Sequence, residues 1–181
     1  TDTVWVYDPG NSVWTLLTSM PTARSAGGTA VIDGKIYVVG GRPPQGQDFA
    51  VYEPASDSWT SLTPLPTARN HFATAAIDGK VYVVGGRFGG NVGSEKAAIV
   101  EVYDPVTNAW TEAAAMPTAR AGINGIASNG CLCIFGGEGN ADNPAGVFDL
   151  AEVYDPSSDT WRSLQAMPTP VHGVNGAAVI N

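Results

Sequence analysis

The sequence predicts an all-β protein built from repeated units. Aromatic residues mark the repeat, with tryptophans at Trp14, Trp59, Trp110 and Trp161 and tyrosines at Tyr7, Tyr52, Tyr103 and Tyr154. Both series advance by 45, 51 and 51 residues. Glycine contributes 22 of the 181 residues and only 14% are charged, which is typical of short strands joined by tight turns. A period of this size is typical of a propeller or solenoid, in which each unit buries its hydrophobic face against its neighbours.

Each full repeat divides into four short apolar segments, which in the first full repeat cover residues 25–32, 35–39, 49–52 and 59–65. The first two segments of the repeats are joined by Asp33-Gly34, Asp78-Gly79 and Asn129-Gly130. These dipeptides favour a two-residue hairpin turn with positive φ at both positions. The second segment is apolar on both faces, which suits a strand sandwiched between neighbouring sheets.

The third segment of each repeat stops at a proline, which is Pro9, Pro54, Pro105 or Pro156. Proline has no amide hydrogen and therefore ends the strand ladder. A tryptophan-led fourth segment follows. Each full repeat is thus expected to be a four-stranded antiparallel meander.

At these motifs the chain resembles the kelch family over essentially all of its length. The matching elements are the diglycine after an apolar strand, as in Tyr37-Val38-Val39-Gly40-Gly41, the Tyr103-Asp104-Pro105 type of strand end, and a tryptophan seven residues beyond each tyrosine. Corners of the form Met-Pro-x-x-Arg also match, at residues 20–24 and 116–120. The resemblance implies a β-propeller with four-stranded blades. The fourth corner departs from the pattern, because Val171 stands in the arginine position.

The predicted organisation is one kelch-type propeller domain or fragment over residues 1–181, a partial ring of about three and three-quarter blades. Residues 1–23 supply the third and fourth strands of a first blade, residues 24–68, 69–119 and 120–170 form full repeats, and residues 171–181 supply the first strand of a last blade. One second strand is missing from this set, which would leave unpaired strand edges. We therefore expect either a fragment of a larger propeller or a subunit that completes its ring by self-association, for example as a C2 pair.

The repeated landmarks are expected to be structural. Large aromatics supply the most buried area per residue, so the tryptophans and tyrosines should pack between blades, with stacking on a ligand as the alternative. The diglycines should allow backbone conformations or close approaches that a Cβ would forbid. The corner arginines Arg24, Arg69 and Arg120 should bond backbone carbonyls or an acid at the corner, with a charge facing a ligand as the alternative.

Strand directions put the loops after the second strands and the corners between repeats on the same face, here called the corner face. Its loops hold ten, sixteen and sixteen residues before the next tyrosine, whereas the turns of the opposite face are nearly uniform. Unequal loops on a repeated scaffold are where binding usually resides. The candidate ligand-binding residues on the corner face are Arg42, Arg87, Glu138, Asn70, His71, His172, Phe88 and Asn91. They suit a polar ligand or an acidic peptide, and an ordinary solvated loop surface is the alternative.

Several function classes find little support. The net charge of −8 and the scattered lysines argue against nucleic-acid binding, and no apolar run is long enough to span a membrane. Cys131 and Cys133 lie two apart on one expected strand, where they are predicted to be core residues without a disulfide. An oxygen-rich loop contains Glu138, Asn140, Asp142 and Asn143, but its spacing is not that of an EF-hand, so no metal or cofactor is expected.

The sequence thus predicts a non-catalytic binding scaffold for a protein or peptide. It holds two histidines and no nucleophile elbow, so an enzyme is not expected. The alternatives are a carbohydrate-binding or sugar-active propeller, possibly bacterial and exported, and a purely structural or assembly module. Scarce lysine and abundant Thr, Asn, Gly and Trp favour export slightly, and the compartment stays open.

Overall fold

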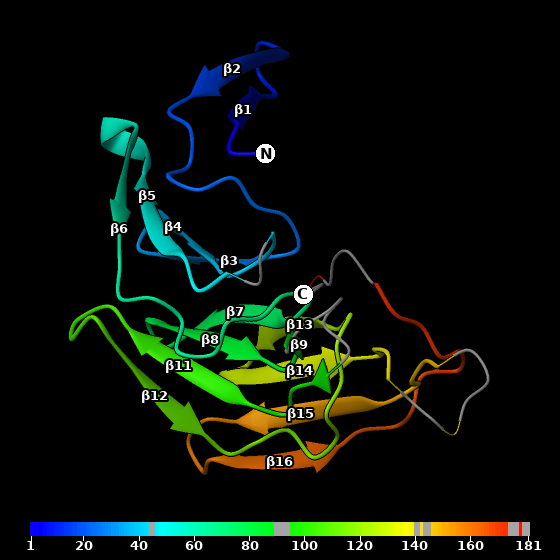
Figure 1. The fold of residues 1–181 in the computed structure, drawn as a ribbon. Helices are drawn as coiled ribbons and strands as arrows, with labels where there is room; N and C mark the ends of the chain where they lie inside the picture. The colour runs from blue at the N-terminus through cyan, green and yellow to red at the C-terminus, as the bar shows by residue number, and fades with distance from the viewer. Residues whose placement is uncertain (44–45, 89–94, 140–141, 143–145, 174–177, 179–181) are drawn as a thin grey trace.

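The fold is a row of antiparallel β-sheets in a computed structural model, which describes residues 1–43, 46–88, 95–139, 142, 146–173 and 178. Three sheets have four strands each, and they follow a two-stranded sheet at the start of the chain (Figure 1). The described residues contain no α-helix, and therefore none that could cross a membrane. The predicted all-β class and the four-stranded kelch-type blades are confirmed.

The blades are numbered I to IV along the chain. Blade I pairs β1 (Val4–Asp8) with β2 (Val13–Leu17). Blade II contains β3 (Gly28–Ile32), β4 (Lys35–Val39), β5 (Phe49–Glu53) and β6 (Ser58–Ser61), with a 3-10 turn, η1 (Pro54–Ser56), between the last two. Blade III contains β7 (Ala73–Ile77), β8 (Lys80–Val84), β11 (Val100–Asp104) and β12 (Ala109–Ala113). Blade IV contains β13 (Asn124–Ser128), β14 (Cys131–Phe135), β15 (Ala151–Asp155) and β16 (Thr160–Ser163).

In the first full repeat the second strand occupies the expected residues, the first and fourth strands are shorter than predicted, and the third is one residue longer. Strand β4 covers residues 35–39 as predicted, and the Asp-Gly and Asn-Gly turns have positive φ at both positions. Strand β6 ends at Ser61, four residues before the predicted end, because Pro64 cannot donate to the ladder and Leu65 bonds a loop carbonyl instead. A short hairpin of β9 (Arg87–Phe88) and β10 (Glu95–Lys96) was not predicted. The predicted strand at residues 171–180 lies largely outside the described residues, and 171–173 form no strand.

Neighbouring blades bury one another's hydrophobic faces. One core cluster joins blades II and III, where the rings of Phe49 and Tyr103 meet edge to face at 4.6 Å between centroids. A second cluster joins blades III and IV, where Tyr82 and Tyr154 lie 6.2 Å apart. This confirms that the repeated aromatics pack between blades. Blade I is the exception, because no described blade covers Tyr7 and Trp14.

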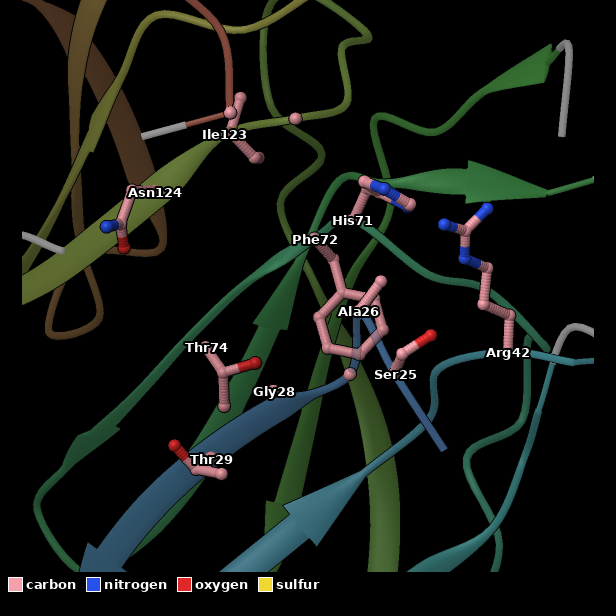
Figure 2. A pocket seen from close by; sticks show the side chains of 13 residues that line it. Ser25, Ala26, Gly28, Thr29, Arg42, His71, Phe72, Thr74, Ile123 and Asn124 are labelled. Carbon is pink, nitrogen blue, oxygen red and sulfur yellow. The ribbon is translucent and has the colours of Figure 1, made fainter. Parts of the chain in front are cut away.

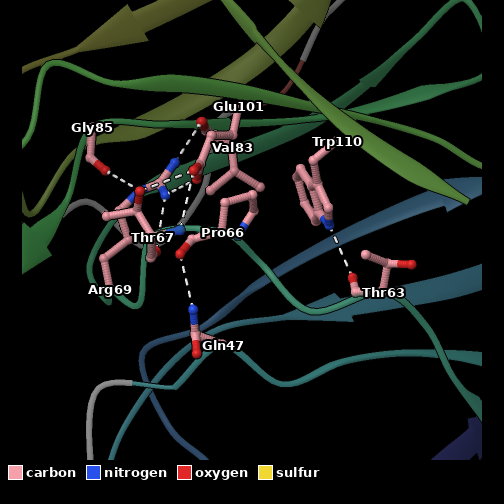
Figure 3. A network of polar contacts seen from close by, with 9 residues as sticks. All are labelled: Gln47, Thr63, Pro66, Thr67, Arg69, Val83, Gly85, Glu101 and Trp110. Atoms are coloured by element: carbon pink, nitrogen blue, oxygen red, sulfur yellow. Dashed lines mark hydrogen bonds and ion pairs between the residues drawn. The ribbon is translucent and has the colours of Figure 1, made fainter.

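Each of the three inter-blade contacts also carries the same polar clamp, here called the Tyr–Asx–Trp clamp. In blade III, the hydroxyl of Tyr103 donates to Oδ1 of Asn108 at 2.7 Å. The same oxygen accepts the amide of Thr63 in blade II at 3.1 Å, and the indole of Trp110 donates to the Thr63 carbonyl at 2.9 Å (Figure 3). The clamp recurs as Tyr52–Asp57–Trp59 on Thr18 and as Tyr154–Asp159–Trp161 on Ala114.

The corner arginines hold each blade to its own corner. Arg69 is fully buried, donates to the carbonyls of Val83 and Gly85 at 2.9 Å each, and pairs with Glu101 (Figure 3). Arg120 and Glu152 repeat this pair in blade IV. Within the described residues Arg24 bonds carbonyls alone, because Ala50 occupies the position in blade II that is equivalent to Glu101. The predicted carbonyl or acid contact is confirmed, although the acid lies on the third strand rather than in the corner.

The two cysteines lie on β14 as predicted, and both thiols are free. They are half-buried rather than core residues, because their side of β14 faces away from blade III, whereas Leu132 and Ile134 point into the contact between the blades.

Candidate functional site

The loops and the corners meet as the strand directions require. Backbone bridges pair Ser25 with Arg42, Asn70 with Arg87, and Ala121 with Glu138. Each bridge joins a corner residue to the residue that follows a diglycine. The structure therefore brings the three equivalent positions 42, 87 and 138 to the corner face, beside the start of the innermost strands.

A chain of backbone hydrogen bonds links the blades directly beneath these bridges. The amide of His71 donates to the Ala26 carbonyl at 3.0 Å, Gly122 donates to His71 at 2.9 Å, and Gly173 donates to Gly122 at 2.9 Å. All four residues have positive φ, between 54° and 67°. They share the 45, 51 and 51 spacing of the aromatics. His71 is therefore held in a backbone conformation that glycine adopts more readily. The hydrogen bonds to Ala26 and Gly122 fix this backbone and thereby set the direction of the His71 side chain.

The inner strands of blades II, III and IV enclose a cavity of about 510 Å³ at this face, here called the inner-strand cavity. It is lined by residues 25–29, 71–72 and 122–124 with Arg42, Thr74 and Gly173. Figure 2 shows the Arg42 guanidinium and the His71 imidazole on one side of the cavity, and Thr29, Thr74 and Asn124 on the other. Its volume lies in the range of small-ligand and peptide side-chain pockets.

Two lining side chains offer unused hydrogen-bonding capacity. The guanidinium of Arg42 is exposed and has no partner among the described residues. The hydroxyl oxygen of Thr74 is buried and also lacks a described partner. Buried polar groups are normally satisfied, so an orphan hydroxyl at a cavity wall marks a place for a ligand group or water.

Arg87, which occupies the position equivalent to Arg42 in blade III, already has an acidic partner. Arg87 forms an ion pair with Glu138 of the next blade, and both side chains are largely buried. His172 is exposed, and its Nδ1 lies 3.8 Å from the second carboxylate oxygen of Glu138. Arg87, Glu138 and His172 thus form one cluster across the contact between blades III and IV, whereas Arg42 stays apart from it.

His71 stands between these cationic groups. Burial lowers the pKa of His71, Arg87 and Arg42 lower it further, and Glu138 opposes the shift. Its Nδ1 lies 2.5 Å from Oδ1 of Asn70, which is itself buried. A neutral imidazole at pH 7 is therefore expected at the cavity wall, able to donate or accept a hydrogen bond.

The remaining candidates lie further out or outside the described residues. Phe88 is half-buried on the β9–β10 hairpin and does not line the inner-strand cavity. Asn91 lies outside the described residues, as do Asn140 and Asn143 of the oxygen-rich loop. Within the described ranges, no group of three or more His, Cys, Asp or Glu side chains is placed to hold a metal ion.

Two features of the site were missed by sequence reasoning. Thr74 and Thr29 are equivalent inner-strand residues 45 apart, and strand alternation places their side chains on the same face of their respective sheets. The chain of positive-φ residues was also detectable, because Gly122 and Gly173 recur at the position of His71 with the repeat spacing.

Comparisons with known proteins agree with this architecture. The family model described as the KLHDC2/KLHL20/DRC7 Kelch-repeats domain matches residues 1–180. Kelch-like protein terF of Aspergillus terreus is 33% identical over 178 residues, covering 93% of this chain and 39% of that protein. Kelch-like protein 24 of Rattus norvegicus is 44% identical over 164 residues, covering 90% of this chain and 25% of that protein.

The solved structure of YjhT shares the fold, with a TM-score of 0.72 at 22% identity over 84% of this chain and 54% of that chain. The present chain thus spans only a quarter to two fifths of the length of the two curated relatives. The repeated blades, the clamps between them and the match over nearly all residues lead to one conclusion. The chain belongs to the kelch-repeat family.

Proposed function

We propose that this chain is a non-catalytic kelch-repeat scaffold that recognises a protein or peptide partner through the corner face. The observation that carries the proposal is the guanidinium of Arg42, which lies at the wall of the inner-strand cavity and has no partner within the described part of the chain. An acidic side chain or main-chain carbonyl of a partner would satisfy it with a charge-assisted hydrogen bond. The two curated relatives, which are Kelch-like proteins by name, support a binding scaffold as the class of function.

The cavity chemistry favours recognition over catalysis. Its hydroxyl groups belong to Ser25, Thr29 and Thr74, and no hydrogen bond joins any of them to His71 among the described residues. A nucleophile needs such a neighbouring base to be activated. The orphan hydroxyl of Thr74 and the neutral His71 suit instead the backbone amides and carbonyls of a bound segment.

The proposed binding residues extend from the cavity to the loops around it. Arg42, His71 and Asn70 form one part, and the cluster of Arg87, Glu138 and His172 forms another. Phe88 and Asn91 would contribute from the loop between β8 and β11. This function involves neither nucleic acid nor a membrane, and it needs no cofactor. Self-association would use a different surface, the exposed face of β1 and β2.

The test is selection of binders from a displayed random-peptide library, followed by fluorescence anisotropy with the selected peptides. Arg42→Ala is expected to weaken binding by at least tenfold, because a hydrogen bond to a charged group is worth about 1.5–3 kcal/mol. Arg162→Ala is the matched control, since Arg162 is an exposed arginine on the outer strand β16. Equal affinities of the two variants would reject the corner face as the binding surface.

A glycan array distinguishes the carbohydrate alternative. Binding to a defined glycan that is lost in Phe88→Ala, together with a peptide library that yields no binder, would replace the protein-binding function by carbohydrate recognition. Aromatic rings are the usual platforms for the apolar faces of sugars, and Phe88 lies on the hairpin beside the candidate cluster.

A further inference from the structure

His71 places a polar side chain where the equivalent repeat positions have none. The positions equivalent to His71 hold Ala26, Gly122 and Gly173, and all four residues have positive φ. A histidine is less favourable than glycine in this left-handed conformation. Backbone strain of this kind persists where the surrounding structure enforces it, and it is concentrated at functional sites. The imidazole of His71 is therefore a candidate for a specific task at the cavity wall.

Asn70 determines which nitrogen of His71 carries the proton. The Nδ1 atom of His71 lies 2.5 Å from Oδ1 of Asn70, which is a buried residue. An amide oxygen can only accept a hydrogen bond, so Nδ1 is the donor and holds the proton of the neutral ring. The other ring nitrogen, Nε2, then keeps its lone pair, and it has no partner in the described part of the chain. His71 thus presents a hydrogen-bond acceptor.

Arg42 presents a donor beside this acceptor. Figure 2 shows the guanidinium of Arg42 next to the imidazole of His71, and both side chains line the inner-strand cavity. The positive charge of Arg42 also lowers the pKa of His71, which agrees with their proximity. Within the described ranges the Arg42 guanidinium has no partner, whereas Arg87 is paired with Glu138. One wall of the cavity therefore offers a donor and an acceptor side by side.

We propose that Arg42 and His71 together recognise a primary carboxamide, the side-chain group of glutamine or asparagine, in a bound peptide. This inference rests on the proposed peptide-binding function and narrows its ligand. A primary carboxamide carries its carbonyl oxygen and one N–H along the same edge. The oxygen would accept from the guanidinium of Arg42, and the N–H would donate to Nε2 of His71. Phe72 and Ile123 also line the cavity and offer apolar surface to the methylene groups of the ligand.

A carboxylate fits the same pair only when His71 is protonated. Burial and the arginines hold the pKa of His71 below 6.5, so at pH 7 a carboxylate oxygen would face the lone pair of Nε2. Binding of a carboxylate must then take up a proton, which weakens it about tenfold for each pH unit above that pKa. The other charged groups that face His71 are Arg87 and Glu138. His172 lies 3.8 Å beyond them, measured from its Nδ1 to Glu138, and its charge can also depend on pH.

NMR of the His71 ring nitrogens tests the acceptor on the protein alone. Proton–nitrogen correlation spectra at pH 7 distinguish the two neutral tautomers, with the assignment taken from His71→Gly. We expect the proton on Nδ1. Propionamide should then shift the Nε2 resonance, and propionate at the same concentration should shift it less. A dominant Nε2–H tautomer, equal shifts with both probes, or no shift with either would overturn the proposal.

The peptides selected against the corner face supply the second test. The relevant peptide position is the one whose substitution loses its effect in Arg42→Ala, as a double-mutant cycle detects. Glutamine at this position should bind about tenfold more tightly than glutamate at pH 7, and the ratio should shrink as the pH falls through the pKa of His71. A preference for glutamate at pH 7 would contradict the carboxamide site. A library without binders would count against the proposed function alone, because the NMR experiment needs no peptide.

A glycine variant separates the imidazole from the fold. His71→Gly removes the ring and restores the residue found at the equivalent Gly122, so it should keep the structure and abolish both the glutamine preference and its pH dependence. Asn129→Gly is the matched control, since Asn129 also has a positive φ, of 50°, but lies in a turn of the opposite face. A preference or pH dependence that survives His71→Gly would assign the discrimination to another group, such as His172, and overturn the role of His71.

Discussion

The guanidinium of Arg69 pairs with the carboxylate of Glu101, which lies 32 residues further along the chain, and the two side chains are 0% and 1% exposed. The other carboxylate oxygen accepts the amide and the hydroxyl of Thr67, at 3.1 and 2.9 Å. Burial lowers the pKa of Arg69, and the charge of Glu101 opposes that shift. The corner before blade III is thus tied to its third strand through charged groups that have no access to water.

Removal of this carboxylate should strongly destabilise the fold. Glu101→Ala leaves a buried guanidinium without its counter-charge, which should lower the free energy of unfolding by about 3–5 kcal/mol. Urea denaturation measures the change. The control is Glu112→Ala, because Glu112 is exposed on the neighbouring strand directly opposite Glu101 and should change stability by less than about 0.5 kcal/mol. Similar losses for both variants would show that the buried pair has no special role.

The Asx position of the clamp permits a matched series at one residue. Asn108→Ala removes the oxygen that accepts from Tyr103 and Thr63 and places an alanine at a φ of 51°, so the expected loss is about 2–3 kcal/mol. Asn108→Asp keeps the acceptor, as at Asp57 and Asp159, and should be nearly neutral. Asn108→Gly relieves the backbone strain alone and should fall between the two. Calorimetry or urea unfolding measures the change. Equal free energies of unfolding for Asn108→Asp and Asn108→Ala would show that the side-chain oxygen does not stabilise the contact between the blades.

The strands were the most predictable part of the fold, because local signals agree there. Strand β4 followed from its apolar residues and from the Asp33-Gly34 turn, both of which act within a few residues. The β9–β10 hairpin could not be predicted, since it lies in a glycine-rich loop without alternating hydrophobicity. The exposure of Trp14 was not predicted either, because its local sequence matches that of the repeats whose tryptophans pack against a neighbouring blade.

For the candidate site, the sequence predicted which residues share a face of the propeller, but it made no prediction of which of their side chains form ion pairs. The shared face of Arg42, Arg87 and Glu138 follows from their common place after a diglycine and is observed as backbone bridges. Among the three, Arg87 and Glu138 form an ion pair. Glu101 as the partner of Arg69 was detectable, because an acid recurs two residues before Tyr103 and Tyr154 wherever the corner arginine is buried.

The clamp tyrosines should make the protein sensitive to alkali. The hydrogen bond to Asp57 raises the pKa of Tyr52 to about 12, and burial raises the pKa of Tyr103 to about 12. Unfolded tyrosine loses its proton near pH 10, so above that pH the unfolded chain binds fewer protons than the folded protein. The free energy of unfolding should therefore fall between about pH 10 and pH 12 and stay unaffected by these groups below pH 10.

Urea unfolding across this range, with the ultraviolet absorbance of tyrosinate as a second probe, measures the effect. Tyr52→Phe should reduce the slope of stability against pH, because one shifted group is gone. A free energy of unfolding that stays constant from pH 10 to pH 12 would show that the tyrosine hydroxyls are not held in the clamps.

The pKa of His71 should report the positive charge of the arginines beside it. Burial, Arg87 and Arg42 hold the pKa of His71 below the ordinary value of 6.5, so Arg42→Met should raise it. Proton NMR of the imidazole resonance measures the shift, with assignment from the spectrum of His71→Gln. Arg162→Met removes a distant arginine of equal charge and should leave the titration unchanged. The same midpoint in Arg42→Met and the unmodified protein would place Arg42 away from the cavity wall.

A positive-φ glycine should tolerate a side chain only where no neighbouring blade approaches it, which separates the turn glycine Gly79 from the diglycine residue Gly85. Gly79 and Gly85 both have positive φ, at 72° and 65°, so an alanine at either position carries about 1 kcal/mol of backbone strain. A Cβ on Gly79 would meet nothing within 4 Å, whereas a Cβ on Gly85 would lie 2.8 Å from the Arg120 carbonyl oxygen and 2.8 Å from Cδ1 of Ile123. Gly85→Ala should therefore cost about 1–3 kcal/mol more than Gly79→Ala in urea unfolding, because blades III and IV must separate to admit the methyl group. Equal losses would mean that the glycine serves its own backbone conformation and not the contact between blades.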